Sequence, residues 1–178
     1  MLSALTDIDV VFHEAAPGGF MPEMAKYVLV NSFATVQMLE IIRDRKLPHK
    51  VVVASSQAVY SERAALCEIH GHVAPSLRPA EQFRAGDFLV HCPQCGRSAT
   101  SLPTPEGTPG GRETVYALTK VDQERLVLLR GKQTGIPTVA LRYSCTYGPR
   151  QSLFNPYTGV IAIIWQDLNS RWQFRHLE

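Results

Sequence analysis

Three short runs of apolar, mostly β-branched residues predict buried strands at residues 7–12, 51–54 and 138–143. Continuous apolar runs of this length are typical of strands covered on both faces, as in parallel sheets. Two longer segments between them, residues 22–46 and 113–132, are predicted to be helical. The order strand, helix, strand, insert, helix, strand indicates an α/β fold with a doubly wound parallel sheet.

Apolar residues at helical spacing support the first helix, and turn residues close both helices. The apolar positions are Val28, Phe33, Val36, Leu39 and Ile42. Pro48 disfavours helical backbone at the residue before it, so the first helix is expected to end there. The second helix is expected to end before Gly135 and Pro137, because glycine often follows a helix and proline cannot continue one.

The segment between the second strand and the second helix has a different composition. From residue 61 to 111 helical and strand periodicity fade, and proline and glycine become dense. A loop of this length is either disordered or held by a device of its own. We therefore divide the chain into a sheet domain (1–60 and 112–164), an insert (61–111) and a divergent or truncated tail (165–178).

The insert contains two matching groups of metal-ligand residues. Cys-x-x-His-Gly at residues 67–71 and Cys-x-x-Cys-Gly at residues 92–96 share one spacing, and residues 71–91 separate their ligands. Each resembles a zinc knuckle, in which a tight turn presents two side chains and the glycine relieves the backbone. The predicted ligands of a structural zinc are Cys67, His70, Cys92 and Cys95. His72 could replace His70 but lacks the matched spacing, and unrelated thiols in a loop remain the alternative.

Composition and charge narrow the classes of protein. The 178 residues are 45% hydrophobic and 19% charged, with a formal net charge of +2, so nothing favours nucleic acid or a membrane surface as a partner. The N-terminus has no signal-peptide pattern, and no apolar run approaches the roughly 20 residues of a membrane helix. We expect a cytoplasmic protein whose cysteines are reduced, which favours metal binding or burial over disulfides.

Two features could form a catalytic site, one as a general acid/base and the other as a hydroxyl that hydrogen-bonds a substrate oxygen. Tyr116 and Lys120 form Y-x-x-x-K, which places phenol and ammonium on one helix face. An ammonium beside a phenol favours loss of the phenol proton, as a general acid/base requires. Ser55 and Ser56 follow a buried strand at the sheet edge where ligands bind in open α/β folds. An exposed helix face and a serine that caps the backbone are the alternatives for the two features.

Four segments, in order, resemble the extended short-chain dehydrogenase/reductases, the NAD-dependent epimerase/dehydratase family. VVFHEAA at residues 10–16 is similar to the family strand that ends in H-x-A-A. NSFAT at 31–35 resembles N-x-x-G-T, and SSQAVY at 55–60 resembles S-S-x-x-V-Y. LRYSCTYGPRQ at 141–151 resembles L-R-Y-x-N-x-Y-G-P-R-Q. Residues 151–159 also resemble a branch near the dTDP-rhamnose 4-epimerases.

The resemblance implies a partial Rossmann-like fold, a nucleotide-sugar substrate and NAD or NADP as the cofactor. It implies that Tyr116 is the catalytic acid/base, that Lys120 is its partner and contacts the nicotinamide ribose, and that Ser56 orients the sugar. The positions it implies at the cofactor are Ala15, Ala16, Asn31, Ser55, Tyr116, Lys120 and Tyr143. The activity implied is epimerisation through a 4-keto intermediate, and homodimer formation by a full-length relative is left open.

Several departures from the family pattern keep alternatives open. Cys145 replaces an asparagine near the substrate diphosphate, and Gln57 and Ala58 stand where dehydratases have acidic residues, which disfavours dehydration. Arg142 and Arg150 could bind the diphosphate or form ordinary ion pairs. No G-x-G-x-x-G turn occurs, so we expect a chain that lacks both ends of the fold and binds NAD poorly. A catalytically inactive fragment, a zinc-bound interaction module and a reductase or dehydrogenase of the same family are the alternatives.

Overall fold

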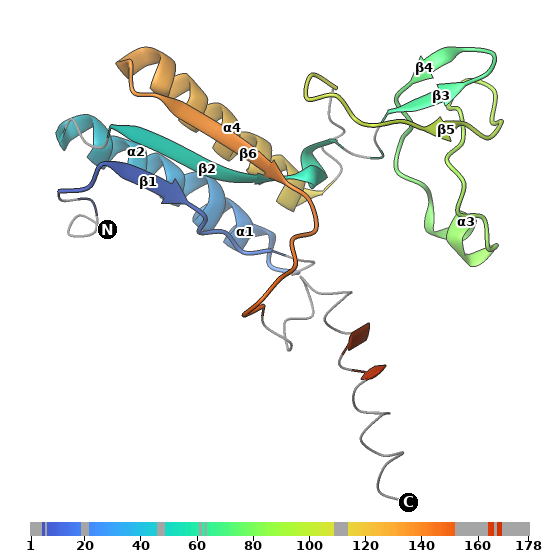
Figure 1. Cartoon of the computed structure of the whole chain (residues 1–178), viewed down its shortest axis with the longest axis horizontal. Coiled ribbons are helices and arrows are strands. Elements are labelled where there is room, and N and C mark those ends of the chain that lie inside the picture. Colours follow the sequence, from blue (N-terminus) through green and yellow to red (C-terminus); the bar gives the residue numbers. More distant parts are fainter. Residues whose placement is uncertain are drawn as a thin grey trace, which may run out of the picture.

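A parallel three-stranded sheet forms one part of the molecule (Figure 1). The computed structural model describes residues 5, 7–18, 22–45, 49–60, 62, 64–108, 114–151, 164–165 and 167–168. The strands are β1 (Val10–His13), β2 (Lys50–Ser56) and β6 (Thr138–Tyr143), in the order β1-β2-β6. All three predicted strands are confirmed, although the first begins at Val10 and not at residue 7. Their carboxyl ends share one edge of the sheet because the pairing is parallel.

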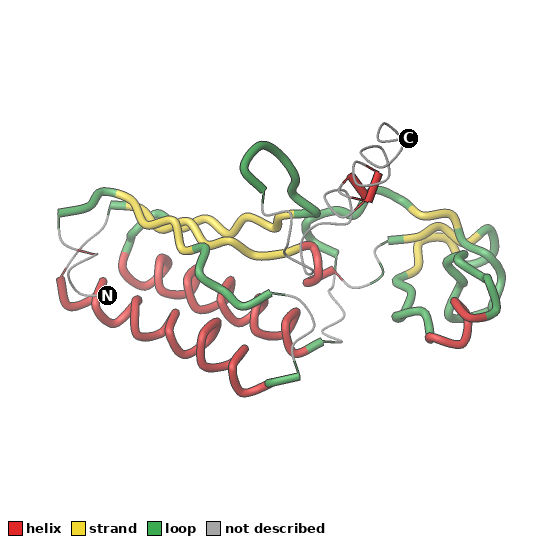
Figure 2. The backbone as a smooth tube through the Cα atoms, turned by 90° about the horizontal axis from the view of Figure 1, so that it is seen from below, coloured by secondary structure: helices red, strands yellow, loops and turns green. Residues whose placement is uncertain are grey.

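Two helical segments pack against the sheet on the same face (Figure 2). The first is continuous from α1 (Met24–Tyr27) through the π-helix η2 (Val28–Phe33) to α2 (Ala34–Arg45), and the second is α4 (Val115–Thr134). Both predicted helices are thus confirmed to within about two residues. The buried cluster between helices and strands consists of Leu5, Val11, Met38, Leu39, Ile42, Val51, Val53 and Val127.

The opposite face of the sheet is open within the described residues. Alternate strand residues point to it and stay exposed, namely Val10, Phe12, Val139, Leu141 and Tyr143. A doubly wound fold has a second helical layer, and the described part of the chain does not supply one. The parallel sheet with crossover helices is confirmed, whereas the second layer stays a prediction.

The ends of α4 follow the turn chemistry of its sequence. The Thr114 hydroxyl accepts a hydrogen bond from the Ala117 N–H at 3.0 Å and caps the start of the helix. Gly135 ends it with a left-handed φ of 75°, which a residue without Cβ adopts without strain. The predicted stop before Gly135 is confirmed. Just upstream, Gly131 lies so close to Thr138 that a Cβ there would overlap its side chain.

The insert is ordered and has a sheet of its own. A 3₁₀ turn, η3 (Gln57–Tyr60), leads out of β2 towards it. Its elements are β3 (Ala65–Cys67), β4 (Gly71–Val73), α3 (Ala80–Arg84) and β5 (Thr100–Ser101), with antiparallel order β4-β3-β5. Its buried cluster contains Ala65, Cys67, Val73, Cys92 and Ala99.

The predicted tail at 165–178 lies almost wholly outside the described residues.

The sequence also predicts that no helix spans a membrane. None of the described helices combines the length and the apolar character needed to cross a membrane.

Candidate active site and metal centre

Tyr116 and Lys120 lie one turn apart at the start of α4. The Lys120 ammonium is 6.0 Å from the centre of the Tyr116 ring and is only 3% exposed. Its Nζ donates a hydrogen bond of 2.8 Å to the carbonyl oxygen of Ala54 in β2. Burial lowers the pKa of Lys120 to about 8. The predicted shared helix face is confirmed, and the ammonium is fixed to the carboxyl end of the central strand.

Ser56 is the last residue of β2, where η3 begins. It pairs with Tyr143 of β6, and its hydroxyl accepts a hydrogen bond from the Ala58 N–H at 3.2 Å. The capping role that we kept as an alternative is therefore present. A hydroxyl that accepts one bond still has a proton to donate, so the cap leaves Ser56 able to bind a substrate oxygen. The hydrogen bond from Lys120 to Ala54 joins α4 to the carboxyl end of this strand. That the hydroxyls of Ser56 and Tyr116 lie close together stays a prediction.

Asn31 sits in the π-helix η2 and is completely buried. Its Nδ2 donates to the Thr119 hydroxyl at 3.0 Å, and that hydroxyl donates to the Tyr116 carbonyl oxygen at 3.0 Å. These bonds tie the first helical segment to the turn of α4 that carries the Y-x-x-x-K pair. The Asn31 Oδ1 has no hydrogen-bond partner among the described residues and is a free acceptor at the site. Single π-helical turns occur often at functional sites, but the apolar periodicity gave no sign of this one.

A second buried polar cluster holds the end of β1. The Thr35 hydroxyl lies 2.7 Å from His13 Nε2, and Gln123 Nε2 donates to Thr35 at 3.0 Å. Burial, with Lys120 nearby, lowers the pKa of His13, so the imidazole is neutral near pH 7. The loop after His13 carries the predicted cofactor residues Ala15 and Ala16, which are exposed and half-buried. The cluster therefore fixes the position from which this loop leaves the sheet.

Arg142 joins the sheet domain to the insert. Its guanidinium donates to both Glu124 carboxylate oxygens, at 2.8 and 3.0 Å, and to the Glu106 carbonyl oxygen at 2.8 Å. It also lies over the Tyr60 ring, 4.7 Å from the ring centre. Burial raises the pKa of Glu124, but the Arg142 guanidinium and the Ser55 hydroxyl lower it by more. These internal bonds favour the ion-pair interpretation of Arg142 over a role in binding diphosphate.

The two serines after the second strand face opposite sides of the sheet. Ser55 pairs with Arg142 on the helical side, and Ser56 pairs with Tyr143 on the open side. Among the predicted site residues of these two strands, Ser56 and Tyr143 therefore share the open face, and the cofactor role of Ser55 on the other face stays a prediction. Near them, Gln57 Nε2 lies 3.5 Å from the sulfur of Cys145 and makes a weak polar contact with it. Cys145 is the residue that replaces an asparagine of the family pattern.

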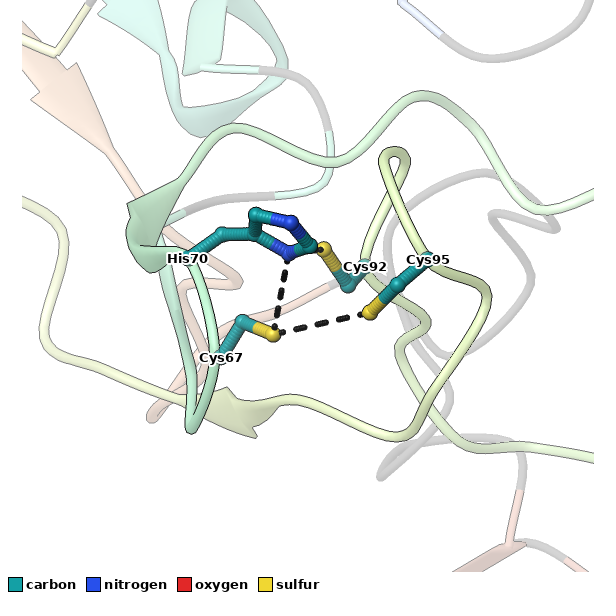
Figure 3. Close-up of side chains that lie close together, drawn as sticks. All are labelled: Cys67, His70, Cys92 and Cys95. Carbon is teal, nitrogen blue, oxygen red and sulfur yellow. Dashed lines mark hydrogen bonds between the residues drawn. The ribbon is translucent and has the colours of Figure 1, made fainter.

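The four predicted metal ligands of the insert converge (Figure 3). Their ligand atoms all lie within 4.8 Å of one another, although they come from two turns of the chain. Cys67 Sγ lies 3.7 Å from His70 Nδ1 and 3.8 Å from Cys95 Sγ, and Cys92 Sγ lies 3.5 Å from His70 Nδ1. His72 is not part of this group, so the matched spacing selected the histidine that the structure places with the thiols.

The thiols of this group are unpaired and electrostatically coupled. All four cysteines of the chain are free, and Cys145 is the exposed one outside the cluster. Backbone hydrogen bonds from His70 and Ile69 lower the pKa of the Cys67 thiol to about 6. Burial and the neighbouring sulfurs of Cys92 and Cys67 raise the pKa of Cys95, despite a backbone hydrogen bond that lowers it. Three sulfurs this close repel one another as they ionise, which a bound cation would relieve.

The sequence model of an NAD-binding family described as male sterility protein matches residues 2–166. The chain belongs to this family. Over 160 residues it is 31% identical to dTDP-L-rhamnose 4-epimerase of Burkholderia thailandensis, covering 87% of this chain and 42% of that protein. It is an extended short-chain dehydrogenase/reductase, as the four sequence segments predicted, and its relatives are enzymes.

Solved structures of two sugar-nucleotide epimerases share the fold. UDP-glucuronic acid 4-epimerase from Bacillus cereus, in complex with NAD, is 30% identical with a TM-score of 0.58, covering 85% of this chain and 37% of that one. UDP-N-acetylglucosamine 4-epimerase from Methanobrevibacter ruminantium M1 is 25% identical with a TM-score of 0.66, covering 95% and 44%. The chain therefore spans less than half the length of these relatives.

Proposed function

We propose that the protein carrying this chain is an NAD-dependent nucleotide-sugar 4-epimerase with Tyr116 as its acid/base. The observation that carries the proposal is the buried Lys120 ammonium, held against Ala54 one helical turn from Tyr116. An ammonium in this position serves no evident packing purpose, and it stabilises negative charge on a neighbouring phenol. The names of the relatives, which are 4-epimerases of three different nucleotide sugars, support the same reaction type.

The residues at the carboxyl edge of the sheet fit the nicotinamide half of NAD. Lys120 has three donors and one hydrogen bond within the described residues, so two donors are available for ribose hydroxyls. The buried Asn31 Oδ1 is an acceptor without a partner among those residues. The 178 residues contain no G-x-G-x-x-G or G-x-x-G-x-x-G pattern for a pyrophosphate-binding turn. We therefore still expect the chain by itself to bind NAD weakly.

In the proposed reaction, bound NAD supplies oxidation and re-reduction at C4 of the sugar. The Tyr116 oxygen takes the proton of the 4-hydroxyl during oxidation and returns it during reduction. Lys120 keeps positive charge beside that oxygen, and the Ser56 hydroxyl donates a hydrogen bond to the sugar oxygen. The 4-keto sugar turns over between the two steps, so that reduction occurs on its other face. Gln57 and Ala58 offer no acid or base for elimination of water.

The test is product stereochemistry in the protein that carries this chain. With NAD and a panel of UDP- and dTDP-sugars, we expect NMR spectra to show inversion at C4. Tyr116→Phe should reduce turnover by about 100-fold or more, the usual range for an acid/base, while NAD affinity is unchanged. Tyr147→Phe is the matched control, because Tyr147 is 68% exposed and is not one of the predicted catalytic or cofactor-binding residues. Full turnover in Tyr116→Phe would exclude the proposed mechanism.

The same experiment separates the alternatives. Net consumption of a reduced nicotinamide cofactor without inversion would indicate a reductase of the family. NAD binding and turnover both absent would indicate an inactive chain or an interaction module.

A homodimer is the assembly we propose, since Leu118 and Leu129 of α4 are 50% and 55% exposed and offer an apolar contact surface. Sedimentation equilibrium measures the assembly directly.

A further inference from the structure

We propose that the insert binds one Zn²⁺ ion and that this ion holds its two turns together. The ligands are Cys67, His70, Cys92 and Cys95, which bind through three sulfurs and the histidine Nδ1. The site lies outside the nucleotide-sugar site, and its occupation does not depend on any activity of the protein. It has four ligands and no open position, so its role is structural.

Three of the six separations between the ligand atoms have the lengths of a tetrahedral zinc site, and all six are within 4.8 Å. With Zn–S bonds of about 2.3 Å and Zn–N bonds of about 2.0–2.1 Å, the edges of a tetrahedron are about 3.8 Å between sulfurs and about 3.6 Å between sulfur and nitrogen. The structure has 3.8 Å between Cys67 and Cys95, and 3.7 and 3.5 Å from His70 to two sulfurs. A disulfide needs about 2.05 Å, so these thiols are spaced for a shared ion and not for each other.

The donor set selects the kind of metal. Three thiolates and an imidazole are soft to borderline ligands, which suit zinc and disfavour magnesium or calcium. Cys67 and Cys92 are buried, with 2% and 1% exposure, whereas hard divalent cations take carboxylate and carbonyl oxygens.

The backbone of both turns is shaped to present the ligands (Figure 3). Gly71 and Gly96 each follow the second ligand of their turn, and both adopt a left-handed φ, of 67° and 69°. That conformation is unfavourable for residues with a Cβ, so both glycines are required by the turn. In the second turn the Gly96 N–H donates to the Cys92 carbonyl oxygen at 2.9 Å, which closes the loop around the metal position.

The insert needs such a link because its apolar core is small. Within the described residues, the buried cluster consists of two cysteines with Ala65, Val73 and Ala99, and the partly buried Val90 packs against it. Phe88 and Leu89 remain 67% and 57% exposed, so the larger apolar side chains do not enlarge this core. Units of this size commonly depend on metals or disulfides for folding. We infer that zinc connects the β3–β4 turn to the turn at residues 92–96.

The first test is the metal content of the whole chain purified without chelator or added metal. We expect one zinc per chain by mass spectrometry in the wild type, and loss of zinc in Cys92→Ser and in His70→Ala. The controls are Cys145→Ser and His72→Ala, which change a free thiol and a histidine outside the cluster and should retain one equivalent. Wild-type protein with far less than one equivalent, or Cys92→Ser with full zinc, would overturn the proposal.

A second test uses unmodified protein and does not depend on whether variants fold. We expect one reactive thiol, Cys145, in the native chain and four after zinc is removed by a chelator. Cobalt added to the apo chain should give the intense absorption of tetrahedral thiolate coordination, and His70→Cys should strengthen its sulfur-to-metal band. Four reactive thiols before chelation would overturn the proposal. The proposal would also be overturned if the thiols became reactive after treatment with a reductant but not after treatment with a chelator. That result would show that they form disulfides. Neither result bears on the proposed epimerase activity.

Discussion

Replacement of Arg142 by methionine tests the junction between the sheet and the insert. The substitution keeps an unbranched apolar stem but removes the guanidinium that contacts Glu124, Glu106 and Tyr60. Glu124 is 5% exposed, so the change leaves a buried carboxylate without its cation. Breaking a buried pair in this way costs about 3–5 kcal/mol. The Arg142 side chain is 29% exposed and admits some water, so we expect the lower end, about 3 kcal/mol.

Two companion variants separate charge burial from lost packing. Glu124→Gln leaves the cation partly solvated and should cost about 1–2 kcal/mol. The double variant should be more stable than Arg142→Met alone, because no charge is then buried without a partner. Arg43→Met is the matched control: its ion pair with Asp44 has side chains 54% and 61% exposed, so its removal should have far less effect.

The assay is urea unfolding followed by circular dichroism, repeated from pH 7 to acid. The pKa of Glu124 is lowered in the folded state, so its stabilising contribution is present above the unfolded pKa and is lost as pH falls through the folded pKa. In Arg142→Met burial raises the pKa of Glu124 without the opposing guanidinium, so the difference in stability from wild type should begin to shrink above pH 4.5 and continue to shrink as the pH falls further. A loss no larger than that of Arg43→Met, or a double variant less stable than Arg142→Met, would refute the buried-pair argument.

Three further substitutions probe the core and the site by the same unfolding assay. Gly131→Ala should lower the free energy of unfolding by about 1–3 kcal/mol because a Cβ would overlap Thr138. Gly107→Ala is the control, since Gly107 has open space around it and its substitution should leave stability unchanged. Equal effects of the two substitutions would contradict the overlap. Burial lowers the pKa of Lys120 from 10.5 to about 8. As the pH rises, the folded protein therefore releases the Lys120 proton before the unfolded chain does, and the free energy of unfolding increases between about pH 8 and pH 10.5. Relative to Lys120→Met, the free energy of unfolding of the wild type should increase by about 2 kcal/mol from pH 7 to 9.5. If the difference between the two proteins does not change with pH, the lowered pKa of Lys120 is contradicted. Thr35→Val should cost about 1–3 kcal/mol by removing the buried hydroxyl that both His13 and Gln123 contact, and an unchanged free energy of unfolding would contradict this.

Local patterns in the sequence determined the elements and the metal ligands. The apolar runs predicted β1, β2 and β6, and helical periodicity predicted the two helical segments on the sheet. The Y-x-x-x-K spacing predicted that Tyr116 and Lys120 share a face, and the knuckle spacing selected His70 over His72. The strand, helix and Y-x-x-x-K predictions depend on neighbours within about five positions, where backbone geometry alone decides which side chains are adjacent. The metal-ligand prediction compared two such local groups, which residues 71–91 separate.

The tertiary structure decided which distant polar groups meet. Gln123 contacts His13 across 110 positions of sequence, and Asn31 reaches Thr119 across 88. The Glu124 carboxylate pairs with Arg142 because α4 packs on β6, and nothing in either segment's own pattern marks the other as its partner. Such contacts depend on the register and packing of whole elements, since a shift of one residue along a strand turns every side chain to the other face. The same reason separates Ser55 from Ser56, which are adjacent in sequence and lie on opposite sides of the sheet.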